Sequence, residues 1–161
     1  MTKALITGSY DPITVGHMDI IARCSKMFDE VIVLISKNSE KNYMLCSNSR
    51  AALAEDAVKS FGNVSVDIYD GMIAEYAVNK NITTVVKGLR NEKDYIYENE
   101  MALVNMRLAK TIFGGDCETL YMPCKPEFSD VSSTLVRILI KQGKDFSSLV
   151  PNAELLKQKL M

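Results

Sequence analysis

The residues best suited to chemistry lie in a loop near the N-terminus, residues 7–17. Gly8 and Ser9 are small, so a ligand can approach the backbone closely there. Gly16 and His17 begin a helical pattern, and the free N–H groups of a helix N-terminus suit a phosphate. The imidazole of His17 can also donate a hydrogen bond to phosphate oxygens. The loop is neither a P-loop nor a Gly-x-Gly-x-x-Gly dinucleotide turn, so it indicates a phosphate site of another kind.

A second candidate site lies near the C-terminus, where Ser132, Ser133 and Thr134 precede an apolar helical pattern. Ser132 or Ser133 is a plausible N-cap of that helix. A phosphate site at the same helix start is an equally good interpretation of these three residues. Lys87 and Arg90 follow a short apolar run and add positive charge where a strand ends.

Short apolar runs alternate with longer amphipathic segments along the chain. The apolar runs predict five strands, at residues 4–7, 31–36, 64–68, 83–86 and 119–122. Helical spacing of apolar residues predicts helices at residues 16–28, 53–61, 72–78, 94–113, 132–142 and 152–160, with a polar loop over 37–47. Repeated β-α-β units imply an α/β fold, a doubly wound five-stranded parallel sheet with helices on both faces. Such a sheet binds ligands at the carboxyl ends of its strands.

The length and composition are those of an ordinary globular protein. A chain of 161 residues is enough for one domain, 1–161. Apolar residues make up 47% and charged residues 24%, which excludes disorder, collagen-like repeats and a disulfide-dense miniprotein. Lys and Arg number 19 against 20 Asp and Glu, a net charge of −1. Nucleic-acid binding through bulk positive charge is therefore not expected, although a local basic pocket is possible.

The cysteines and the N-terminus indicate a protein of the reducing cytoplasm. Cys24, Cys46, Cys117 and Cys124 form no Cys-x-x-Cys pair, and His17 is the only histidine, so no zinc site is expected. The apolar stretch at the N-terminus is too short for a signal peptide. No apolar run approaches the ~20 residues of a membrane span, so no membrane is expected as a partner.

Two motifs carry a resemblance to a known family. Thr14-Val15-Gly16-His17 is similar to the (T/H)-x-G-H signature of a nucleotidyltransferase superfamily, and residues 131–137, VSSTLVR, resemble its I-S-S-T-x-x-R element. With residues 8–12 and 87–90, they resemble the bacterial phosphopantetheine adenylyltransferases, which have a Rossmann-like nucleotidyltransferase fold. The similarity covers nearly the whole chain and is weakest over 108–122 and after 144.

The resemblance implies transfer of the adenylyl group of ATP to 4′-phosphopantetheine, giving dephospho-coenzyme A and pyrophosphate. The attacking phosphate has its second pKa near ~6, so it is already ionised at neutral pH and needs no protein base. No covalent intermediate is needed either, so positioning and charge stabilisation remain as the protein's tasks. The family also implies Mg²⁺, held largely by the phosphates of ATP without a dedicated protein metal site, and a homohexamer. Apolar residues of the long helix are candidates for an interface or for core: Met101, Leu103, Val104 and Met106.

The resemblance also assigns site residues. His17 is expected to donate to the α-phosphate and stabilise the transition state, and Ser9 to contact both substrates. The ATP-binding residues implied are Ser9, Tyr10, His17, Gly88, Leu89, Arg90, Glu98, Phe128, Ser129, Asp130, Val131, Ser132, Ser133 and Thr134. The residues implied for phosphopantetheine are Ser9, Lys41, Ile73 and Lys87. Lys87 stands where relatives commonly have Arg, which keeps the charge but loses the bidentate fork.

Several of these residues have a plainer interpretation. Lys41 lies in a polar stretch where a lysine is usually just solvated, and Ile73 is of a type more often found in a core. Asp94 and Glu98 are four residues apart and could form a solvated acidic helix face. Asp11 is expected to fix its own loop by hydrogen bonding to nearby backbone.

Cys46 and Cys124 lie in expected loops near the site, where either could be a reactive thiol.

Two other functions fit the same residues. Relatives that use nicotinate mononucleotide or glycerol phosphate usually carry H-x-G-H, whereas this chain has Thr14 at the first position. A regulatory nucleotide-binding module would bind ATP without releasing pyrophosphate. Retention of His17, Arg90 and the Ser-Ser-Thr element argues against that module.

Overall fold

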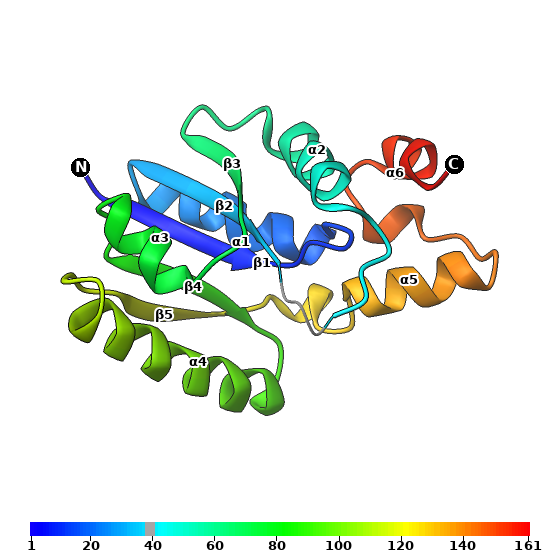
Figure 1. Ribbon diagram of the computed structural model, residues 1–161. Coiled ribbons are helices and arrows are strands. Elements are labelled where there is room, and N and C mark those ends of the chain that lie inside the picture. The colour runs from blue at the N-terminus through cyan, green and yellow to red at the C-terminus, as the bar shows by residue number, and fades with distance from the viewer. Residues whose placement is uncertain (38–40) are drawn as a thin grey trace.

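The computed structural model describes residues 1–37 and 41–161. Its sheet consists of β1 (Lys3–Gly8), β2 (Glu30–Ser36), β3 (Val64–Tyr69), β4 (Thr84–Leu89) and β5 (Glu118–Pro123), all parallel. The strand order is β3-β2-β1-β4-β5, with β1 in the centre (Figure 1). The chain adds strands on one side of β1 and then returns to add strands on the other. This confirms the predicted doubly wound sheet, and it places the reversal of strand order between β1 and β4.

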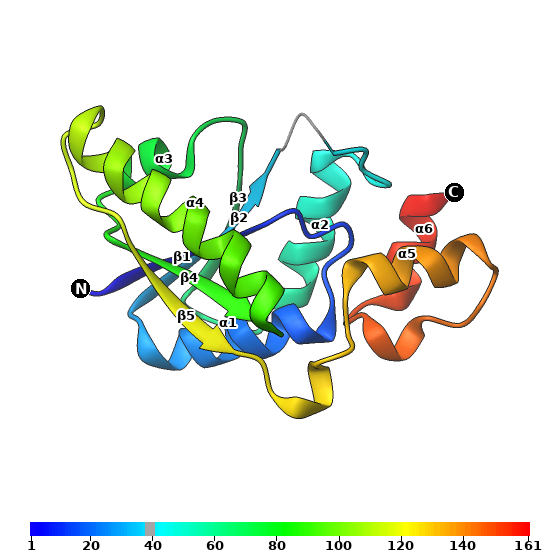
Figure 2. The ribbon, with the colours of Figure 1, turned by 90° about the horizontal axis from the view of Figure 1, so that it is seen from below.

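The helices cover both faces of the sheet. They are α1 (Val15–Met27), α2 (Ser47–Val58), α3 (Ile73–Asn79), α4 (Glu92–Thr111), α5 (Ser133–Lys141) and α6 (Ala153–Leu160), with short 3-10 turns at Pro126–Phe128 and Ser147–Leu149. Helix α4 runs along one side of the sheet and α1 along the other, as Figure 2 shows.

Alternation along the central strand divides the core into two parts. Ala4 and Ile6 of β1 belong to a buried cluster with residues of α1, α2, α5 and α6. Leu5, between them, belongs to a second cluster with residues of α3 and α4. Because successive side chains of a strand point to opposite faces, a continuous apolar run is what a sheet covered on both sides requires.

Two predicted boundaries were wrong. Strand β4 does not stop before Lys87 but runs to Leu89, because β5 pairs with it up to the Leu89 and Pro123 positions. Helix α2 begins at Ser47, where the predicted loop ends, but it finishes at Val58, whereas the apolar spacing carried it to residue 61. Its first turns contain few apolar residues, and their inward position is occupied by Arg50, which is only 1% exposed. A periodicity of apolar residues cannot detect a buried arginine.

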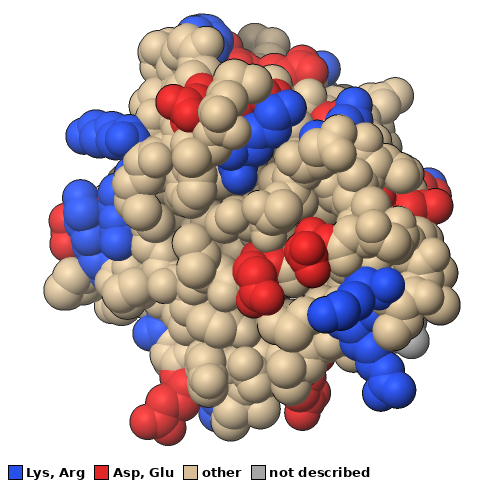
Figure 3. Space-filling view, turned by 90° about the vertical axis from the view of Figure 1, so that its left-hand side faces the viewer, with Lys and Arg blue, Asp and Glu red and all other residues tan. Residues whose placement is uncertain are grey.

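The face at the amino ends of the strands carries mixed charge. Figure 3 shows Lys and Arg side chains interspersed with Asp and Glu on this face, which is opposite the carboxyl ends of the strands. Within residues 1–37 and 41–161, no helix combines the length and the apolar character needed to cross a bilayer.

Candidate active site

A cavity of about 630 Å³ opens at the carboxyl ends of β1 and β4, where the strand order reverses. Its volume is within the usual range for a small-molecule site. Thirteen of the residues predicted for the site line it, namely Ser9, Tyr10, His17, Lys41, Lys87, Gly88, Arg90, Glu98, Phe128, Val131, Ser132, Ser133 and Thr134. The tertiary structure therefore brings the two motifs, at residues 14–17 and 131–137, to one cavity.

Four predicted residues do not line this cavity. Leu89 is the last residue of β4, and Ser129 and Asp130 are exposed in the turn before α5. Ile73 begins α3 and packs, partly buried, against the core cluster on the α3 and α4 face. The packing of Ile73 agrees with its plainer interpretation as a core residue.

The side chain of Tyr10 ties the loop after β1 back to that strand. Tyr10 is 3% exposed, has a positive φ of 49°, and donates its hydroxyl hydrogen to the Ile6 carbonyl at 3.1 Å. Burial raises the pKa of the Tyr10 hydroxyl well above its usual range, so it stays a neutral donor. A Cβ on Gly8 would lie 3.0 Å from the Tyr10 ring, so a larger residue there would have to push the ring aside by a few tenths of an ångström. The tyrosine is therefore a packing residue whose backbone faces the cavity.

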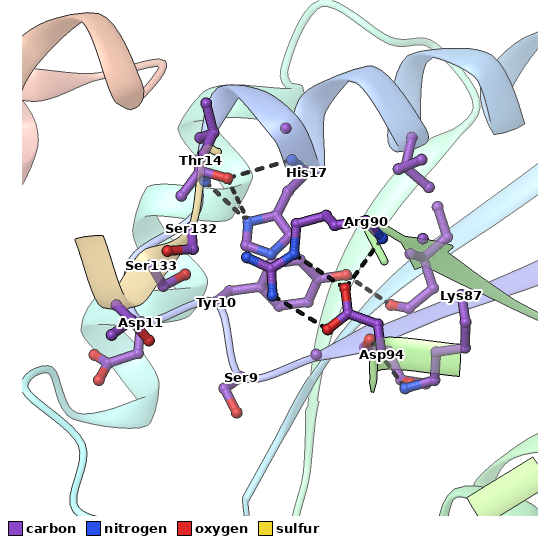
Figure 4. Close-up of a pocket in the computed structure, with 18 of the residues that line it drawn as sticks. Ser9, Tyr10, Asp11, Thr14, His17, Lys87, Arg90, Asp94, Ser132 and Ser133 are labelled. Carbon is purple, nitrogen blue, oxygen red and sulfur yellow. Dashed lines mark hydrogen bonds and ion pairs between the residues drawn. The ribbon is translucent and has the colours of Figure 1, made fainter. Parts of the chain in front are cut away.

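His17 occupies the third position of α1, where it completes a capping box. The N-cap Thr14 accepts a hydrogen bond from the His17 N–H, and His17 Nδ1 accepts one from the Thr14 N–H at 3.0 Å (Figure 4). The Thr14 hydroxyl also lies 3.1 Å from Nδ1. Because Nδ1 accepts from a backbone donor, the proton of the neutral ring sits on Nε2. The free ring nitrogen of His17 is thus a hydrogen-bond donor.

The surroundings of His17 keep its ring uncharged. Burial, and then the positive charge of Arg90, lower the pKa of His17 from 6.5 to about 4. The Tyr10 ring packs edge-on against the imidazole, with 4.9 Å between ring centroids. At neutral pH the site therefore holds a neutral imidazole with Nε2–H available. Such a donor can stabilise charge that develops on a phosphate oxygen.

Two cations of the cavity are paired with acids of α4. Lys87 Nζ lies 3.3 Å from Glu98 Oε2, and Arg90 Nε lies 3.1 Å from Asp94 Oδ2 (Figure 4). Asp94 and Glu98 are one helical turn apart, and both line the cavity. The interpretation of these two acids as a solvated helix face was therefore wrong. Each carboxylate stands where an anionic ligand would meet the same cation.

The start of α5 forms the opposite side of the cavity. Ser132 is its N-cap, and its hydroxyl accepts a hydrogen bond from the Leu135 N–H at 3.0 Å. The Ser133 hydroxyl donates to the Pro12 carbonyl at 2.7 Å. The predicted cap is confirmed at Ser132, and both side chains line the cavity beside the free N–H groups of the helix start.

The structure corrects the prediction for Asp11. Its carboxylate does not bond to its own loop but accepts from the N–H groups of Met44 and Leu45, at 2.8 and 2.9 Å. The Asp11 carbonyl accepts a hydrogen bond from the guanidinium of Arg137. Sequence reasoning could not find this tie, because Asp11 and Leu45 are 34 residues apart.

Sequence reasoning also missed Arg50. Its guanidinium donates to the Ser9 carbonyl at 2.6 Å and to the Ser36 carbonyl at 3.3 Å. It stacks over the Tyr43 ring at 4.0 Å from the centroid. The only feature of the sequence that could have pointed to this role is an arginine at a position of α2 that faces the core. Its position there fixes the loop that carries Ser9 against the end of β2.

The cysteines separate into buried and accessible pairs. Cys24 and Cys117 are buried, and burial raises the pKa of the Cys24 thiol to about 11. Cys124 lines the cavity, half-buried. Cys46 is exposed at the start of α2, and hydrogen bonding with Ser49 lowers the pKa of its thiol.

Comparisons with known proteins agree with this geometry. A family profile described as cytidylyltransferase-like matches residues 5–138. The phosphopantetheine adenylyltransferase of Alkaliphilus oremlandii is 40% identical over 151 residues, 94% of this chain and 93% of that protein. Proteins of the same name from Frankia alni and Corynebacterium diphtheriae are 40% and 39% identical, over 96% and 95% of this chain and 94% and 93% of theirs.

The fold has a solved counterpart as well. A crystal structure from Vibrio parahaemolyticus, described as a nicotinate-nucleotide adenylyltransferase, superposes with a TM-score of 0.69. It covers 99% of this chain and 95% of the other at 22% identity, a likeness of fold.

Proposed function

The chain belongs to the phosphopantetheine adenylyltransferase family of the cytidylyltransferase-like nucleotidyltransferases, and on that basis we propose how its cavity transfers the adenylyl group of ATP to 4′-phosphopantetheine. The products are dephospho-coenzyme A and pyrophosphate, as in coenzyme A biosynthesis. The observation that carries the proposal is the convergence of His17, Lys41, Lys87, Arg90 and the start of α5 on one cavity.

The two phosphates of the reaction are proposed to bind on different groups. The phosphate of phosphopantetheine is held by Lys41 and Lys87, with Ser9 between the substrates. The triphosphate of ATP is held by Arg90 and by the N–H groups at the start of α5. Each phosphate replaces a carboxylate that now pairs with its cation, Glu98 on Lys87 and Asp94 on Arg90.

The chemical step is a direct in-line displacement. An ionised oxygen of phosphopantetheine attacks the α-phosphorus of ATP, and the bond from that phosphorus to the pyrophosphate oxygen breaks. Pyrophosphate leaves with the bonding electron pair, and no proton needs to move. His17 donates from Nε2 to the α-phosphate oxygen where charge builds up, and its cap on Thr14 holds the ring in that orientation.

Mg²⁺ is proposed as the companion of ATP. The described residues contain no group of three or more His, Cys, Asp or Glu that could hold a metal ion. The cavity carboxylates of Asp94 and Glu98 are paired with cations. This donor set fits an ion held by phosphate oxygens and water, which is the usual preference of Mg²⁺. When bound, it would neutralise charge on the phosphates.

A homohexamer in the cytoplasm is also part of the proposal. Helix α4 exposes large apolar side chains, with Ile96 60% and Leu103 57% exposed. Such a surface supports self-association, and light scattering tests it directly. A reducing compartment agrees with four free cysteines at positions 24, 46, 117 and 124, all among the described residues.

The first experiment measures pyrophosphate release from ATP and Mg²⁺, with 4′-phosphopantetheine and nicotinate mononucleotide as separate acceptors. We expect release only with phosphopantetheine. Release only with the nucleotide would move the chain to a related nucleotidyltransferase. ATP binding without release from either acceptor would instead identify a regulatory module.

A further inference from the structure

A residue with a buried carboxylate, Asp11, joins three of the segments that form the cavity. Asp11, in the loop after β1, is 2% exposed. Its Oδ2 and Oδ1 accept the consecutive N–H groups of Met44 and Leu45 in the loop after β2. Its carbonyl accepts from Arg137 Nη1 of α5 at 2.7 Å, and the same nitrogen lies 4.0 Å from the Asp11 carboxylate.

The segment that Asp11 holds is the base of the loop that carries Lys41. Leu45 is 3% exposed and belongs to the core on the α1 and α2 face. Three residues before Met44, the exposed side chain of Lys41 lines the cavity. The Lys41 side chain has four rotatable carbon–carbon bonds, and among residues 1–37 and 41–161 no ion pair or hydrogen bond fixes it. The backbone of its loop therefore sets where its ammonium group can reach.

We propose that Asp11 is a positioning residue for the acceptor substrate: through Met44 and Leu45 it fixes the Lys41 loop at the distance from Ser9 and His17 that the acceptor phosphate requires. This inference rests on the proposed function, since it assigns Lys41 to the phosphate of phosphopantetheine. Asp11 lines the cavity, but each of its carboxylate oxygens already accepts a backbone N–H, so the role proposed for it is to hold the loop and not to contact a substrate. Its effect is therefore on acceptor binding, and the ATP contacts at Arg90 do not depend on it.

The test compares Asp11→Asn with the unchanged enzyme. An asparagine offers one acceptor oxygen and places an NH₂ group against the second N–H, so one hydrogen bond is lost and two donors face each other. We expect the KM for phosphopantetheine to rise by about 10-fold or more, with the KM for ATP nearly unchanged. Hydrogen exchange at the Met44 and Leu45 amides should become faster in the variant.

Two further variants separate positioning from a merely structural role. Asp56→Asn removes another carboxylate that ties two segments, since Asp56 accepts from Asn152 far from the cavity, and it should leave both KM values unchanged. In a Lys41→Ala background, Asp11→Asn should add almost nothing to the KM for phosphopantetheine, because the residue that it positions is gone.

Several results would overturn the proposal. An equal rise of the KM for phosphopantetheine and the KM for ATP in Asp11→Asn would do so, and so would unchanged KM values. Effects of Asp11→Asn and Lys41→Ala that multiply in the double variant would overturn it as well. Failure of Asp11→Asn to fold would also overturn it, because Asp11 would then be a folding residue first. Failure of the proposed function looks different, since the unchanged enzyme would then release no pyrophosphate with phosphopantetheine.

Discussion

The Nδ1 atom of His17 accepts a hydrogen bond from the backbone N–H of Thr14, its own helix N-cap, at 3.0 Å. One contact thus caps α1 and decides that Nε2, and not Nδ1, carries the hydrogen of the neutral ring. The Thr-x-Gly-His motif can be understood in these terms. Threonine caps the helix, and histidine closes the capping box and keeps its proton on Nε2. A Cβ on Gly16 would meet Phe128 and Val131 at ordinary van der Waals distances, so packing alone does not require the glycine.

The first prediction concerns the protonation of His17. We expect its ring to titrate near pH 4 and not near 6.5, because burial and Arg90 lower its pKa. It is the only histidine of the chain, so its NMR signals are unambiguous. Activity should therefore show no loss from His17 protonation between pH 8 and 6.

The same shift has a consequence for stability. Between pH 6.5 and about 4 the unfolded chain binds a proton on His17 before the native chain does. This group therefore lowers the free energy of unfolding as pH falls through that window, and has no such effect above it. Urea unfolding at several pH values measures this, with His17→Gln as the control that lacks the group. Titration near pH 6.5 would contradict the described environment.

The second prediction separates capping from catalysis at His17. His17→Gln keeps a side-chain acceptor at the third helix position, whereas His17→Ala removes it. We expect kcat to fall by ~100- to 1000-fold in His17→Ala, which has no donor in place of the imidazole Nε2–H, and to fall less in His17→Gln, whose amide NH₂ can still donate. Only His17→Ala should also lose stability, by about 1 kcal/mol. Near-normal turnover in the alanine variant would reject the catalytic role.

The third prediction concerns Lys87. We expect Lys87→Arg to be tolerated, because an arginine keeps the charge and can pair with Glu98. Lys87→Met should raise the KM for phosphopantetheine roughly 10-fold or more, because a charge-assisted contact is lost. Lys3→Met is the matched control, since Lys3 pairs with Glu30 at the amino end of the sheet. A large KM increase in Lys87→Arg would instead show a pocket shaped for lysine.

The fourth prediction concerns Asp94, which pairs with Arg90 and is proposed to compete there with a phosphate of ATP. Asp94→Asn removes a negative charge from a cavity that is proposed to receive a triphosphate. We expect the KM for ATP to fall a few-fold, and the difference to shrink at high salt. Glu92→Gln changes the net charge equally in the same helical turn but outside the cavity, so it should have no effect. A higher KM in Asp94→Asn would mean that Asp94 orients Arg90.

Most of the fold was predictable from local pattern. Continuous apolar runs identify the strands, and periods of 3.6 identify the helices, because burial on two faces or on one stripe leaves those patterns in the sequence. The strand order β3-β2-β1-β4-β5 confirms the inferred class. The extension of β4 to Leu89 was not predictable, since it depends on a partner strand some thirty residues later.

The sequence by itself determined the class of fold and the two phosphate-binding motifs, because each is a local arrangement of residue types. Tertiary structure alone decided which groups meet. It placed Glu98 on Lys87, buried Arg50 beneath Ser9, and turned the Asp11 carboxylate to Met44 and Leu45. These contacts join segments that only the sheet brings together, and a hydrogen bond requires atoms within about 3 Å, which sequence spacing cannot specify.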